Sequence, residues 1–274
     1  MLILSPLGST INLQNLKSSV TVKENRVCRN KEIKITACED SYIFIDASVS
    51  FVSIINCINC TIYVGAVSRV TTIDKCEKIK VTIASNFLRI GNTIDSRINY
   101  YGAYAPVLYG DNRSITIGPY NSNCIQLVQR MKESKLKLTH EYVSNFMAPV
   151  LMNKSTDGGY RIQSLKDYEM LAMPNHFFPV HHTMANNIER LAKRSYEDLL
   201  EAHKKLYSKS NMVVPFLAPL SYKEKVINAH MKFNDTFNKV KNSGLKASQQ
   251  KTVQMNIQGY FKEWLIANGH SKQI

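Results

Sequence analysis

The stretch CEDSYIFIDASVSFVSIINCINCTIYVGAVSRVTTIDKC, residues 38–76, decides the fold because it repeats itself. Its marker residues Cys38, Cys57 and Cys76 lie nineteen residues apart. Apolar residues recur five and seven places after each marker, at Ile43 and Ile45, Ile62 and Val64, and Val81 and Ile83. A second alternating pair precedes each marker, at Ile33 and Ile35, Val52 and Ile54, and Thr71 and Ile73. This period of two predicts two short strands per repeat, with a bend at the cysteine.

The repeat continues past the cysteines with a shorter step of seventeen residues, and the pattern covers residues 33–117. The next two markers are Thr93 and Gly110, and the apolar or aromatic pairs after them are Ile98 and Tyr100, then Ile115 and Ile117. A repeat of 17–19 residues with two strands predicts one coil of a parallel β-helix, in which the alternating residues and the three cysteines point into the core. A leucine-rich repeat is the competing interpretation, but its asparagine and dense leucine pattern are missing.

Composition narrows the class of protein. The 274 residues are 44% hydrophobic and carry a formal net charge of +14, and no apolar run is long enough to cross a bilayer. The N-terminus lacks the features of a secretory signal, so we expect an intracellular protein without a transmembrane segment. The positive charge favours acidic partners such as nucleic acid, anionic lipid or the acidic surface of tubulin. No nucleic-acid motif accompanies the lysines, which argues against nucleic-acid recognition.

Neither a cofactor nor a metal is predicted. The six cysteines are expected to be reduced structural thiols, although Cys57 and Cys60 form a C-x-x-C that leaves metal or redox use as an alternative. Three histidines cluster without a carboxylate or thiol at ligand spacing: His176, His181 and His182. The sequence also has no phosphate loop, dinucleotide fingerprint or nucleophile elbow. A self-contained enzyme is therefore not expected.

The second half of the chain loses the strand period. Helical spacing at Ile125, Val128 and Met131 predicts a helix that caps the last coil, and residues 152–164 are typical of a loop. An irregular apolar segment over residues 164–184 is expected to pack along the side of the β-helix. We predict a β-helix domain with its capping helix over residues 1–135, and a second region over residues 136–274 that contains this irregular segment and about three helices, at 184–208, 221–242 and 249–268.

The last of these helices has one apolar face, formed by Val253, Ile257, Phe261, Trp264 and Leu265. Such a face is usually buried within its own chain, and docking of a partner helix is the alternative.

One arginine is a candidate for action on a partner. Arg89 lies between Leu88 and Ile90, which the repeat turns inward, so Arg89 is predicted to point outward from a strand. A fixed, exposed guanidinium can enter the nucleotide site of a partner and stabilise negative charge on its phosphates. An ordinary surface arginine is the competing interpretation.

The sequence resembles the tubulin-binding cofactor C superfamily, whose C-CAP domain is a right-handed β-helix. The resemblance rests on residues 35–85 and 107–122, which are similar to the repeated C-x-x-x-x-I-x-L pattern of the family. It extends through the tail to YFKEWLIANGH, residues 260–270, which is similar to the TBCC domain-containing branch. The resemblance therefore predicts a mainly β protein with a right-handed parallel β-helix and a helical tail.

The resemblance also carries functional expectations. It implies a non-enzymatic adaptor in the cytoplasm and cytoskeleton, at the centrosome, spindle pole or basal body, that helps to position the centrosome and Golgi. Its expected partners are proteins of a microtubule-organising centre, with tubulin among them. The oligomeric state stays open. Candidate partner contacts are Arg89, Arg97, Phe261 and Trp264.

Cofactor C itself is a GTPase-activating protein that uses the arginine of a Gln-Leu-Arg or Gln-Phe-Arg motif. Here Phe87, Leu88 and Arg89 stand at that place, so phenylalanine replaces the glutamine. GTPase activation through Arg89, on tubulin or a small GTPase, is therefore the alternative function rather than the expected one.

Overall fold

The chain divides into two compact units, Met1–Lys223 and Glu224–Ile274, which are described separately. The structure is a computed structural model, and it describes residues 9–122, 124, 126–137, 139–152, 159–171, 217–219, 221–222, 224–226, 228, 232, 235, 238–239, 242–246, 248–249, 251–253, 255–256, 259–260 and 263.

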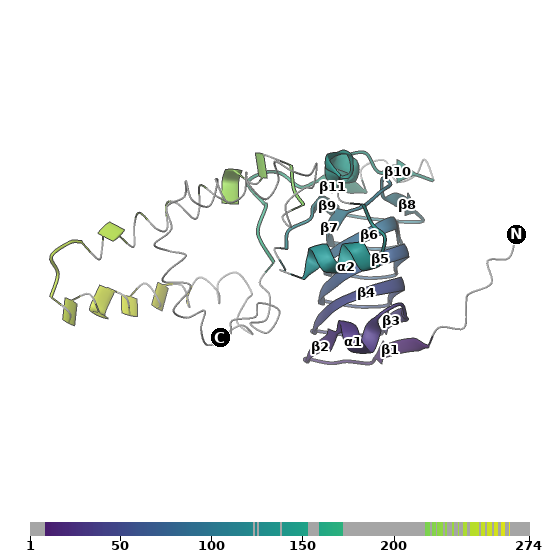
Figure 1. Ribbon diagram of the computed structural model, residues 1–274, viewed down its shortest axis with the longest axis horizontal. Coiled ribbons are helices and arrows are strands. Elements are labelled where there is room, and N and C mark those ends of the chain that lie inside the picture. Colours follow the sequence, from purple (N-terminus) through teal and green to yellow (C-terminus); the bar gives the residue numbers. More distant parts are fainter. Residues whose placement is uncertain are drawn as a thin grey trace, which may run out of the picture. The chain divides into compact units, whose positions relative to one another are not determined.

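The first unit is a parallel β-helix (Figure 1), and every strand pairing in its described part is parallel. Its elements in chain order are β1 (Thr10–Gln14), β2 (Val20–Glu24), α1 (Asn25–Cys28), β3 (Glu32–Thr36), β4 (Tyr42–Ile55), β5 (Thr61–Asp74), β6 (Lys80–Gly91), β7 (Arg97–Tyr101), β8 (Val107–Tyr109), β9 (Ile115–Pro119), α2 (Leu127–Glu133), the 3-10 helix η1 (His140–Met147), β10 (Val150–Leu151) and β11 (Tyr160–Ile162).

The predicted register is confirmed in the central coils. Ile43 pairs with Ile62 and Ile54 pairs with Ile73, a step of nineteen residues in each case. Between β5 and β6 the register shifts, and Ile73 then pairs with Ile90, seventeen residues on. The inward residues are fully buried, so a single apolar core runs through the stacked coils. The fold class predicted from the repeat is therefore correct.

The register predicted for the next coil was wrong by two residues. Ile98 pairs with Ile117, so this step is nineteen residues rather than seventeen. The marker position is Asn112, which accepts a hydrogen bond from the Thr93 amide at 3.1 Å, and not Gly110. Gly110 instead has a φ of +67° in the turn after β8. Because the error was an even number of residues, the inward and outward sides of the strand were still predicted correctly.

Each coil turns at a corner with two left-handed residues. Ala37 and Asp40 have positive φ on either side of Cys38, and the same pair recurs around the markers of the following coils, at Asn56 and Asn59, Lys75 and Lys78, and Asn92 and Asp95. This sharp bend leaves little room inside, which suits the small thiol of a cysteine.

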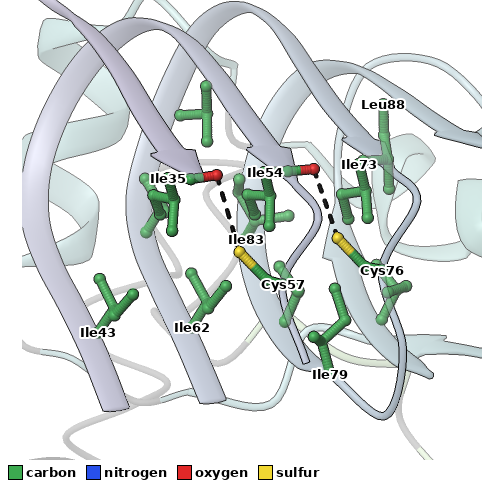
Figure 2. Close-up of a cluster of buried hydrophobic side chains, with 14 of the residues drawn as sticks. Ile35, Ile43, Ile54, Cys57, Ile62, Ile73, Cys76, Ile79, Ile83 and Leu88 are labelled. Atoms are coloured by element: carbon green, nitrogen blue, oxygen red, sulfur yellow. Dashed lines mark hydrogen bonds between the residues drawn. The ribbon is translucent and has the colours of Figure 1, made fainter. Parts of the chain in front are cut away.

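The three marker cysteines form the expected interior ladder, and each is at most 2% exposed. The thiol of Cys57 donates to the carbonyl of Ile35 at 3.8 Å, and that of Cys76 donates to the carbonyl of Ile54 at 3.6 Å (Figure 2). Each thiol therefore reaches into the preceding coil. All the described cysteines are free thiols.

Helix α2 was predicted to cap the last coil, but it lies on the side of the β-helix. It packs across β4 and β5 (Figure 1), and Met131 is fully buried there. The cause lies on the outward face of these strands, where Phe44 and Tyr63 need cover from water. Arg130 anchors the helix through two hydrogen bonds to the Asp46 carboxylate, at 3.2 and 2.8 Å. Ile125 and the side chain of Val128 lie outside the described residues.

Strands at the C-terminal end of the β-helix come from beyond α2. β10 pairs with β8, and β11 pairs with β9. β11 lies within the segment predicted as a loop, because Tyr160 and Ile162 alternate as the preceding strands do and pack on the core. The described residues after it follow the side of the β-helix as expected, with Tyr168 donating to the Tyr120 carbonyl at 2.9 Å.

The predicted helices can be followed only in part. The helix at 184–208 lies outside the described residues, as do the three clustered histidines. The described positions over 221–239 and 248–263 are helical, in agreement with the second and third helices. The described helices include none with the length and apolar character needed to cross a bilayer.

The stacked core makes a quantitative prediction. Ile54 is fully buried and Ile55, beside it on the same strand, is half-buried and points outward. Ile54→Ala should lower the free energy of unfolding by roughly 2–5 kcal/mol, because it opens a cavity between coils. The matched change Ile55→Ala should cost less than about 1 kcal/mol. Urea titrations followed by circular dichroism measure both, and equal costs would contradict the assigned register.

Candidate functional site

The candidate site is an exposed face of the β-helix around Arg89. Arg89 lies on β6 between Leu88 and Ile90, both of which are fully buried, and its own side chain is exposed. The outward direction predicted for Arg89 is therefore confirmed. In the neighbouring coils its register partners are Thr72 and Val107. A position in the middle of a paired strand holds the backbone of Arg89 rigidly.

An aromatic ring supports the Arg89 side chain. The guanidinium carbon of Arg89 lies 5.0 Å from the centre of the Tyr109 ring, a cation–π contact worth about 0.5–1 kcal/mol at an exposed site. Gly91 makes this contact geometrically accessible, because a Cβ at Gly91 would overlap the Tyr109 ring. The glycine thus lets the ring lie close against the strand beneath Arg89.

A second arginine repeats the arrangement on the same side of the β-helix. The guanidinium carbon of Arg69 lies 5.2 Å from the centre of the Phe51 ring. Phe51, Val70 and Phe87 are register partners in successive coils, and all three are half-buried. This gives a mixed surface, the Arg89 face, formed by Phe51, Arg69, Val70, Phe87, Arg89, Tyr104 and Tyr109.

Phe87 is held by its neighbours and does not project as a free side chain. Its ring makes an edge contact with Tyr104, with the ring centres 6.3 Å apart. Tyr104 in turn is 63% exposed, so an aromatic surface lies beside Arg89. At the position where the family motif has a glutamine, this protein therefore offers an apolar contact and no hydrogen-bonding group.

The electrostatics leave the two arginines free to bind. In the described part of the chain, neither Arg89 nor Arg69 has a carboxylate within ion-pair distance. The nearby Asp74 accepts a hydrogen bond from Asn92 at 2.8 Å. Burial, followed by the charge of Asp74, raises the pKa of Tyr109 above its ordinary value, and Arg89 opposes that shift. Tyr109 is consequently a neutral ring at physiological pH.

The chemistry of the Arg89 face is that of a binding surface. Each guanidinium presents donors in a planar fork that fits a carboxylate or a phosphate group, and the aromatic rings offer apolar area beside it. The residues of the face supply no thiol, imidazole or carboxylate that could act as a nucleophile or base. Among the described residues, no group of three histidine, cysteine or acidic side chains is arranged to hold a metal ion.

Arg97, another predicted contact residue, does not lie on this face. Arg97 begins β7 and pairs with Lys80 and Thr116 in a different strand ladder, where it lies 3.8 Å from Glu169. Phe261 and Trp264 lie outside the described residues. Sequence reasoning missed Tyr109 and the stacked pair of Arg69 and Phe51. A glycine at position 91, opposite an aromatic residue in the next coil, is the sequence feature that could have indicated Tyr109.

The fold and the face define a β-solenoid protein with a rigid, basic and aromatic surface. Comparison with known proteins agrees with this class: residues 30–146 match the family described as tubulin binding cofactor C. The matched residues run from β3 to η1 and so include the central coils of the β-helix.

Several curated relatives are similar along nearly the whole chain. TBCC domain-containing protein 1 of Danio rerio is 20% identical over 272 residues, which is 98% of this chain and 42% of the relative. The protein of the same name from Xenopus tropicalis is 24% identical over 267 residues, 97% of this chain and 42% of the relative. The human one is 21% identical over 252 residues, 92% and 40% respectively. The chain thus spans about two fifths of the length of these relatives.

The support of Arg89 by Tyr109 can be tested through Gly91. Gly91→Ala should lower the free energy of unfolding by roughly 1–3 kcal/mol, because the new methyl group must displace the ring. In the Tyr109→Ala background the same change should cost much less. A double-mutant cycle from urea titrations measures the coupling. If Gly91→Ala costs the same with and without the ring, the close contact described here is wrong.

Proposed function

We propose that this protein is a non-enzymatic adaptor of the cytoskeleton that uses its β-helix as a rigid binding surface. The observation that carries the proposal is the Arg89 face, where two guanidiniums, without an ion-pair partner among the described residues, rest on aromatic rings beside exposed apolar area. The match of residues 30–146 to the tubulin binding cofactor C family supports tubulin, or a protein bound to it, as a partner. We do not assign a chemical step to the protein itself.

The proposed location is a microtubule-organising centre: the centrosome, spindle pole or basal body. The similarity to TBCC domain-containing protein 1 supports this proposal, together with a role in positioning the centrosome and Golgi. In this proposal the β-helix holds one partner and the C-terminal region docks another. Two large apolar side chains are exposed among the described helical positions of that region, Met255 at 61% and Tyr260 at 73%. They are suited to contact with a partner.

The adaptor proposal predicts separable roles for the two regions. Removal of residues 249–274 should abolish localisation of the fluorescently tagged chain to the organising centre, because it deletes the docking helix. Arg89→Ala combined with Arg69→Ala should leave localisation intact and weaken capture of tubulin from solution, because it removes both guanidiniums of the face. Fluorescence microscopy and co-sedimentation measure the two effects. Normal localisation of the truncated chain would count against the proposal.

GTPase activation through Arg89 is the second candidate function. It is favoured by the exposure of Arg89 and by the lack of an ion-pair partner for Arg89 among the described residues, and disfavoured by Phe87, which packs on Tyr104. Where an arginine finger operates, it accelerates hydrolysis by roughly 10³-fold or more.

The adaptor proposal predicts that GTP hydrolysis by tubulin, and by a panel of small GTPases, is unchanged when the purified protein is added. Phosphate release measures this, with Arg89→Ala and Arg69→Ala as a matched pair of arginine variants. Stimulation that Arg89→Ala abolishes and Arg69→Ala preserves would replace the adaptor proposal with an activating role.

A further inference from the structure

A basic groove lies away from the Arg89 face, along the starts of β6, β7, β9 and β11. Its volume is about 700 Å³ and it is open to solvent. The residues that carry its charge are Lys78, Lys80, Asp95, Arg97 and Arg161. Four of these five are cations, so the groove is positive even though Asp95 lies in its wall.

The strand register forces like charges together in this groove. Lys80 of β6 pairs directly with Arg97 of β7. Arg97 pairs in turn with Thr116 of β9, and Thr116 pairs with Arg161 of β11. Like charges opposite each other destabilise a sheet. Desolvation by the groove, followed by the charge of Arg97, lowers the pKa of the Lys80 ammonium, although its side chain as a whole is exposed.

The chain itself neutralises these cations incompletely. Arg97 lies 3.8 Å from Glu169, whose side chain is 62% exposed, and Lys78 pairs with Glu77 at 2.7 Å. Arg161 donates to the Thr116 hydroxyl at 3.0 Å and makes no ion pair in the described part of the chain. The Lys80 ammonium likewise has no carboxylate within ion-pair distance among the described residues. Among the described residues, the groove therefore has two cations, Lys80 and Arg161, without a carboxylate at close range.

The length of the ladder indicates what kind of anion fits. Lys80 and Arg161 are three strand steps apart, which is about 14 Å at the usual strand spacing. A single carboxylate or phosphate reaches one or two of these cations. In an extended peptide, side chains on one side recur about every 7 Å, so three acidic residues at alternate positions also span about 14 Å.

The aromatic content of the groove argues against nucleic acid. Tyr160 is the aromatic residue of its wall, and its ring packs against the core of the β-helix. Single-stranded nucleic acid binds through exposed rings on which successive bases stack, and the described groove residues do not present such a platform.

We propose that this groove binds an extended acidic segment of a partner polypeptide, with Lys80, Arg97 and Arg161 each meeting a carboxylate. Binding relieves the repulsion between Lys80 and Arg97 and recognises charge spacing rather than sequence. This inference does not depend on the partner of the Arg89 face.

The test is a fluorescence anisotropy titration of the full chain with a labelled octaglutamate peptide at low ionic strength. Lys80→Gln combined with Arg97→Gln should weaken binding about tenfold, because two partly desolvated charge pairs are lost. The control, Lys31→Gln combined with Lys132→Gln, removes the same charge elsewhere and should change the affinity less than twofold. Arg97→Lys should bind nearly as well as the wild type, which distinguishes lost charge from misfolding.

Three outcomes would overturn the proposal. Equal weakening by the groove and control variants would assign binding to the overall charge of +14 and not to the groove. Equal affinity for octaglutamine would show that charge is not what is recognised. Tighter binding of a single-stranded RNA of matched charge, lost in the same groove variant, would make the site a nucleic-acid site.

Discussion

Parallel pairing between each residue and its counterpart one coil later is the constraint on which the rest of the structure depends. Ile43 with Ile62 and Ile54 with Ile73 satisfy the backbone hydrogen bonds and align the buried side chains in the same step. A slip of one residue would turn the whole apolar set outward. This explains why the marker cysteines keep so strict an interval. The shortening from nineteen to seventeen residues between β5 and β6 is absorbed at register shifts within β5, between Val64 and Ala66 and between Val67 and Val70.

The regular repeat leaves large apolar side chains on the outer surface of the coils, and other parts of the chain cover some of them. The repeat exposes Phe44 and Tyr63, and α2 covers them, held in part by a largely buried ion pair between Asp46 and Arg130 across 84 residues of sequence. Removing one partner of such a pair leaves an uncompensated charge, so this contact fixes the position of α2. Where no helix covers the strands, their outward side chains remain available. The described part of the chain leaves the Arg89 face and the basic groove exposed in this way.

The inward and outward directions of side chains could be predicted from the alternation along each strand. Contacts between residues far apart in the sequence were missed. Because Leu88 and Ile90 follow the period of two, the outward direction of Arg89 could be predicted from its neighbours alone. The ring of Tyr109 beneath it was missed because the predicted step of seventeen residues does not place Gly91 opposite Tyr109. The lateral position of α2 was missed because Asp46 lies far from it in the sequence. β11 was missed because Gly158 and Gly159 beside it are typical of a loop.

The paired left-handed residues that recur from Ala37 with Asp40 to Asn92 with Asp95 give successive coils the same corner, and parallel pairing stacks each coil as a module at the usual strand spacing. A rod built from such modules can change length only in whole units of roughly 4.8 Å, because any other insertion must leave the rod as a loop at a bend. The separation along the rod between Arg89 and the first coil is therefore an integer number of modules. In the proposed adaptor, which bridges two partners, the β-helix would therefore hold the partners at a distance set by a whole number of coils.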